Sequence, residues 1–135
     1  MKESKDYYAI KVKEEIIFEQ KNDGSTLVVD MDTGRLFEIN EMAYWILQSG
    51  FTISELVYKI SQIYNTNEKI ILQDVENFIS KIDELQWIKK LESKSKDINT
   101  LKMLSNKYIR PIVCEYDMSK GYFSKFISKK SGFDV

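Results

Sequence analysis

Short apolar runs separated by tight turns mark the first part of the chain. The runs are rich in β-branched and aromatic residues, which favour strands. Asp23-Gly24 and Thr33-Gly34 lie between successive runs, and glycine adopts the positive φ that such turns require. The pattern predicts a three-stranded antiparallel meander at residues 16–18, 26–29 and 35–39. Residues 8–12 also alternate, and they either add a fourth strand or lead into the first.

After residue 39 the apolar period becomes helical and predicts three helices. Asn40 is a good N-cap and Gly50 a good C′ residue for the first helix. The capping box Thr52-Ile53-Ser54-Glu55 begins the second helix. The third runs from about residue 70 to 85, after the break Asn65-Thr66-Asn67. It has two apolar stripes, one formed by Ile71, Val75, Phe78, Ile82 and Leu85 and a second formed by Leu72 and Ile79. Together they are wider than one core contact uses.

The order of these elements predicts an α+β domain. It has the outline of a winged helix-turn-helix, with a three-stranded antiparallel sheet followed by three helices, plus a C-terminal extension. We expect the domain to span residues 14–91, a polar linker residues 92–99, and the extension residues 100–135. The formal net charge of −1 hides a contrast, because residues 93–135 contain nine Lys or Arg and four Asp or Glu, a net +5. The other residues have a net charge of −6.

The composition excludes much catalytic chemistry. The chain has no histidine and one cysteine, so it lacks the residues for a His-based triad, a Cys–His pair or the usual tetrahedral zinc site. Asp30, Asp32 and Thr33 are expected to form turns rather than a metal site. We therefore predict no catalytic residues, no metal, no cofactor and no enzyme activity. The lone Cys114 fits a reducing cytoplasm, and we see neither a secretory signal nor an apolar run long enough to span a membrane.

The run VDMDTGRLFEINEMA, residues 29–43, resembles the signature of the PqqD-like family. These are the RiPP recognition elements, which hold the leader peptides of ribosomally made, post-translationally modified peptides. The matching positions are Asp30 or Asp32, Thr33, Gly34, Phe37, Ile39, Asn40 and Ala43. The order and spacing of later residues, to about residue 90, are also similar. One departure is Leu47, where the family often has Trp; the tryptophan here is Trp45.

This resemblance implies a non-catalytic chaperone that binds a leader peptide as an extra strand beside the third helix. The partners it implies are a precursor peptide and a separate modifying enzyme, such as a radical-SAM maturase or a leader protease. Strand addition needs an open edge at residues 35–39, and the whole assignment depends on that edge. A homodimer remains possible. The predicted peptide-binding residues are Arg35, Leu36, Phe37, Glu38, Leu72, Val75, Phe78, Ile79 and Ile82.

Two other functions fit the same outline. A small winged-helix regulator that binds nucleic acid is the first alternative, and an adaptor that binds only protein is the second. Residues 70–86 contain four acidic residues and only Lys81 as a basic one, and the domain is acidic as a whole. Because phosphate is repelled by such a surface, we expect no specific nucleic-acid binding by the domain.

The basic extension permits further hypotheses. Residues 100–107 are compatible with two helical turns, and residues 108–116 are expected to be extended because Pro111 disfavours helix before it. Tyr-x-x-Pro at Tyr108 and Pro111 resembles a motif in the leaders of lasso peptides, so the tail would dock as a pseudo-leader in its own or a neighbour's groove. An expected helical face would pack on the domain or touch a membrane or a partner enzyme; it consists of Tyr122, Phe123, Phe126 and Ile127.

Overall fold

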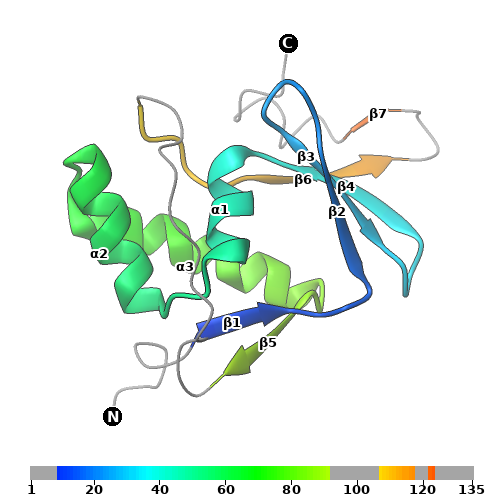
Figure 1. The fold of residues 1–135 in the computed structure, drawn as a ribbon, viewed down its shortest axis with the longest axis horizontal. Helices are drawn as coiled ribbons and strands as arrows, with labels where there is room; N and C mark the ends of the chain where they lie inside the picture. The colour runs from blue at the N-terminus through cyan, green and yellow to red at the C-terminus, as the bar shows by residue number, and fades with distance from the viewer. Residues whose placement is uncertain (1–8, 92–106, 118–121, 124–135) are drawn as a thin grey trace.

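The computed structural model describes residues 9–91, 107–117 and 122–123. The prediction of an α+β fold with strands followed by three helices is confirmed (Figure 1). The elements are β1 (Ala9–Val12), β2 (Ile16–Gln20), β3 (Thr26–Asp30), β4 (Arg35–Ile39), α1 (Glu41–Ser49), α2 (Ile53–Tyr64), α3 (Glu68–Glu84), β5 (Ile88–Leu91), β6 (Val113–Asp117) and β7 (Tyr122–Phe123).

The predicted meander forms the larger of two sheets. Its strand order is β2-β3-β4-β6-β7, and β2, β3 and β4 pair antiparallel over their full lengths. The turn glycines Gly24 and Gly34 have φ of 92° and 79°, as their positions require. Asp30 stabilises the second turn, because its Oδ1 accepts hydrogen bonds from the backbone N–H groups of Asp32 and Thr33. Asp30, Asp32 and Thr33 therefore form a turn, as expected.

Within the described residues, a second sheet is formed by β1 and β5. Its register pairs Ala9 with Leu91 and Val12 with Ile88, so the strand at residues 9–12 lies beside the end of the helical unit and not in the meander. The sequence pattern did not predict β5. A left-handed residue, Gln86 with φ of 63°, separates α3 from this strand.

The helix boundaries follow the predicted caps. Asn40 Oδ1 accepts from Ala43 N at the start of α1, and Gly50 ends that helix with φ of 76°. Thr52 and Glu55 form the capping box of α2. The third helix begins with Asn67 as N-cap, slightly before the predicted start at residue 70. No helix in the described part of the chain is long and apolar enough to cross a bilayer.

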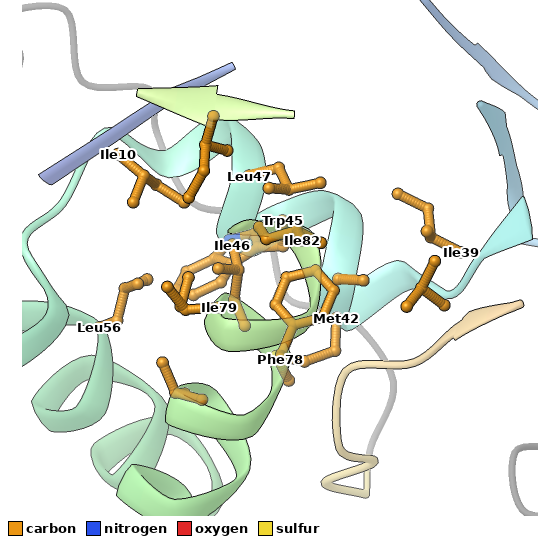
Figure 2. Close-up of a cluster of buried hydrophobic side chains, with 14 of the residues drawn as sticks. Ile10, Ile39, Met42, Trp45, Ile46, Leu47, Leu56, Phe78, Ile79 and Ile82 are labelled. Atoms are coloured by element: carbon orange, nitrogen blue, oxygen red, sulfur yellow. The ribbon is translucent and has the colours of Figure 1, made fainter. Parts of the chain in front are cut away.

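One hydrophobic cluster joins the helices to the larger sheet. Figure 2 shows that residues of α1 and α3 meet in this cluster, among them Met42, Trp45, Ile46, Phe78, Ile79 and Ile82. Phe37 of β4 packs edge-on against Trp87, with ring centroids 5.0 Å apart. Both stripes of the third helix thus reach the core, and the position of β4 relative to α3 is set by buried contacts.

Two expectations about the extension have different outcomes. Tyr122 and Phe123 form the short strand β7, so the helical face predicted for them is wrong. The helical turns predicted for residues 100–107, and the positions of Phe126 and Ile127, lie outside the described residues apart from residue 107.

Candidate functional site

The edge of β4 is occupied by the chain's own C-terminal part. β6 pairs antiparallel with β4 in the register Phe37 with Glu115, Glu38 with Cys114, and Ile39 with Val113. Figure 1 shows β6 alongside β4 in the larger sheet. The expectation of an open edge at residues 35–39 is therefore wrong. The edge accepts an extended segment, as strand addition requires, but that segment belongs to the same chain.

Asn40 binds the backbone of the incoming segment just beyond this register. Its Nδ2 donates to the carbonyl oxygen of Arg110 at 2.9 Å, and its Oδ1 accepts from Ile112 N at 3.1 Å. The backbone N–H of Asn40 donates to Ile112 O at 3.3 Å. The same Oδ1 also accepts from Ala43 N, so one side chain caps α1 and holds the segment. The sequence predicted the cap but not the second role.

Tyr108 attaches the beginning of the segment to the helices. Its hydroxyl donates to Asp74 Oδ2 of α3 at 2.8 Å, and its ring meets Tyr64 of α2 edge-on at 5.8 Å. Burial raises the pKa of the Tyr108 phenol, and the hydrogen bond to Asp74 raises it further. The phenol therefore remains a protonated donor. Asp74 was not predicted as a site residue, because in the sequence it is only one of the four acidic residues within residues 70–86.

Arg35 binds the other end of the segment. Its Nε and Nη2 donate to Glu115 Oε2 and Oε1 at 2.8 and 2.7 Å, and its guanidinium lies 5.3 Å from the centre of the Phe37 ring. The hydrogen bond to Glu115 raises the pKa of Arg35. Both side chains are more than 40% exposed, so we expect this bidentate pair to contribute at most about 1 kcal/mol. Arg35 was predicted to bind a peptide, and here its partner is an acidic residue of β6.

The middle of the segment is buried. Pro111, Ile112, Val113 and Cys114 have little exposed surface. Burial raises the pKa of the Cys114 thiol to about 12, and the nearby Glu38 adds to the effect. Because the thiolate is the reactive form, the native thiol is protonated and inert at neutral pH.

The remaining predicted β4 residues have different environments. Phe37 is a core residue, and Leu36 is half-buried. Glu38 is buried, and its Oε2 lies 2.7 Å from both Lys21 Nζ and Ser25 Oγ. The hydrogen bond to Glu38 raises the pKa of Lys21. The Glu38 carboxylate therefore belongs to a polar cluster inside the meander and is not directed to a ligand.

The predicted residues of α3 are mostly in the core. Leu72 is 36% exposed, whereas Ile79 is 5% exposed. The other three, Val75, Phe78 and Ile82, are also buried. The structure thus places Leu72 alone of the five at the surface. Within the described residues no group of three His, Cys, Asp or Glu side chains could hold a metal ion.

The dual role of Asn40 gives a testable prediction. Asn40→Asp keeps an oxygen for Ala43 N and Ile112 N but removes the donor to Arg110 O. A hydrogen bond of this kind contributes about 0.5–1.5 kcal/mol, so protection of the β6 amides from hydrogen exchange should fall by roughly 2- to 12-fold. The amides of the first turn of α1 should keep their protection. Asn40→Ala is the comparison, because it should also expose that turn by removing the cap. Unchanged β6 protection in Asn40→Asp would show that the Arg110 contact contributes nothing.

Comparison with known proteins adds one match. Residues 25–88 match the family model described as Coenzyme PQQ synthesis protein D (PqqD). This region includes β3, β4, the three helices and the first residue of β5. No curated protein and no solved structure matches the chain.

Proposed function

Residues 25–88 belong to the PqqD family, a family of non-catalytic peptide-binding chaperones, and from this premise we propose a specific role for the chain. The protein binds the leader region of a ribosomally synthesised precursor peptide by strand addition at β4. It then presents the rest of that peptide to a separate modifying enzyme, such as a radical-SAM maturase or a leader protease. The protein itself is not an enzyme.

The main observation in support is the antiparallel pairing of β4 with an extended segment. The sequence-based argument required an open edge, and that argument no longer stands. The family match replaces it, and the pairing with β6 provides a pattern for how a peptide would bind. Asn40 would bind the peptide backbone, Asp74 would accept a hydrogen bond from a donor side chain, and Arg35 would pair with an acidic residue.

Presentation needs no catalytic group in this protein. A leader held at β4 keeps the attached core peptide near a maturase that binds the same complex, and this raises the effective concentration of the core to the order of millimolar. The acidic composition of α3 supports this role over nucleic-acid binding. Asp74, Glu76, Asp83 and Glu84 lie on this helix, and such a helix would repel phosphate.

The proposal predicts measurable binding by the full chain. The probes are fluorescein-labelled synthetic peptides that cover the N-terminal halves of the short peptides encoded beside this gene. We expect one of them to bind with Kd in the micromolar range or below, measured by fluorescence anisotropy. Leu72→Glu should weaken this binding about tenfold, a loss of about 1.4 kcal/mol.

The control is Tyr58→Glu, which introduces the same charge on α2 at a side chain that is 56% exposed. It should leave the affinity unchanged. If no probe binds at 1 mM, or if the Leu72 variant binds as the wild type does, the proposed site is wrong.

A further inference from the structure

We propose that residues 108–117, called here the resident segment, are a reversible occupant of the β4 edge, and that a peptide partner binds by displacing them. The inference rests on the proposed function, because it concerns the same edge. It adds that a segment of the same chain competes with the peptide for this edge. The competitor is the chain's own backbone, docked through β6, Asn40, Asp74 and Arg35.

The core does not depend on the resident segment. Every buried member of the hydrophobic cluster except Val113 comes from residues 10–88, and Tyr108 packs against the cluster only as a partly buried side chain. The match to the family model also ends at residue 88. Most of the core therefore comes from outside the resident segment, and undocking would withdraw only Ile112, Val113 and Cys114 from it.

The pairing of β6 with β4 is shorter than the pairings inside the meander. β6 and β4 share three register pairs, whereas β2–β3 and β3–β4 share five each. At one end the Arg35–Glu115 pair is exposed, and at the other Tyr108 is only half-buried. A short strand whose end contacts are exposed or half-buried opens at lower free energy than the core of the same protein.

The domain holds the resident segment largely by its backbone. Asn40 contacts the carbonyl oxygens of Arg110 and Ile112 and the N–H of Ile112, and not their side chains. Strand pairing likewise uses main-chain groups. Another extended chain offers the same groups in the same spacing, so it can replace the resident segment without a change in Asn40 or β4.

The tether makes this competition significant. The resident segment and β4 belong to the same chain, so their pairing is intramolecular and the local concentration of the segment is on the order of millimolar. A peptide in solution then binds only to the undocked fraction, so its apparent affinity is reduced by that fraction. Weakening the resident segment should therefore strengthen binding of an outside peptide.

Cys114 allows the docking to be measured in the intact protein. It is the single cysteine of the chain, it lies in β6, and it is fully buried. A thiol reagent such as DTNB at pH 8 reacts only when this side chain becomes exposed. We expect the full chain to be labelled through a local opening, with a rate that depends weakly on urea. Labelling only at the rate of global unfolding, with its full urea dependence, would overturn the proposal.

Two variants within the resident segment provide matched tests. Tyr108→Ala removes the contacts with Asp74 and Tyr64, and it should accelerate labelling of Cys114 at least tenfold. Ile109→Ala changes the neighbouring residue, which is 45% exposed, and should leave the rate unchanged. Glu115→Arg, which opposes Arg35, should accelerate labelling independently of any effect at Tyr108. Equal rates in wild type, Tyr108→Ala and Glu115→Arg would overturn the proposal.

A peptide added in trans tests displacement directly. The probe is a synthetic peptide with the sequence of residues 107–117 and with serine in place of the cysteine. It should accelerate labelling of the full chain to a plateau and should bind Tyr108→Ala at least tenfold more tightly than wild type. Failure to bind either protein at 1 mM would mean that β6 is a permanent strand.

Three outcomes separate the possible failures. A labelling rate and an elution volume that change with protein concentration would show a strand exchanged between two copies, and would overturn an occupant from the same chain. Acceleration by the synthetic segment but by no neighbouring precursor peptide would support the resident segment and reject the proposed function. A precursor peptide that binds without changing the rate of Cys114 labelling would support the proposed function and reject displacement of the resident segment.

Discussion

Replacement of Ile79 by glutamate is expected to abolish the folded state and not only peptide binding. The side chain is 5% exposed and lies in the cluster shared by α1 and α3 (Figure 2). An unpaired carboxylate in such a place costs several kcal/mol, which is a large part of the roughly 5–15 kcal/mol that stabilises a domain. Far-UV circular dichroism and urea titration should show a largely unfolded chain. The family resemblance implied that Ile79 lies in the peptide-binding groove, where this change would have spared the helices.

The matched control is Leu72→Glu. Leu72 lies two turns earlier on the same stripe of α3 but is 36% exposed. Its replacement should change the free energy of unfolding by less than about 1 kcal/mol. A cooperative urea transition near that of the wild type in Ile79→Glu would show that Ile79 is not a core residue.

Trp87→Ala is expected to have the next largest effect on stability. Trp87 is fully buried, and its ring packs edge-on against Phe37 of β4 at 5.0 Å. Removing a buried aromatic side chain costs about 3–5 kcal/mol through lost contacts and the cavity that remains. The loss should appear as a large fall in the urea midpoint. It should also loosen β4 relative to the segment between α3 and β5, because the Phe37–Trp87 contact joins them.

Trp87→Phe separates ring packing from other effects. The indole Nε1 of Trp87 is buried and has no hydrogen-bond partner in the structure, so phenylalanine removes no bond. It keeps most of the apolar contact, and we expect a cost of about 1.5 kcal/mol or less. If Trp87→Ala were no more destabilising than Trp87→Phe, the contact with Phe37 would not be what holds β4 against the segment between α3 and β5.

Local chemistry explains why much of the fold could be predicted. The turn at Gly34, the cap at Asn40 and the capping box at Thr52 each require particular residues at fixed short spacings. The structure has all three. The family resemblance likewise rests on a contiguous run of residues, and it is confirmed by the match over residues 25–88.

The environment of each α3 residue could not be read in the same way. Leu72 and Ile79 are seven residues apart, so they lie on nearly the same face of the helix. One is at the surface and the other in the core, because the neighbouring elements cover the stripe at one position and not at the other. A periodic pattern identifies an apolar face, but it does not say how far along the helix that face is covered.

The sequence by itself determined the order of β2, β3, β4 and the three helices, their caps and turns, and the resemblance to the PqqD family, because these depend on residues close together in the chain. Only the tertiary structure decided that β6 occupies the β4 edge, and that Asn40 and Asp74 hold the segment that includes it. The physical reason is that an extended strand offers its backbone to any free edge. Which edge it meets depends on the packing of elements that lie more than seventy residues away in the sequence.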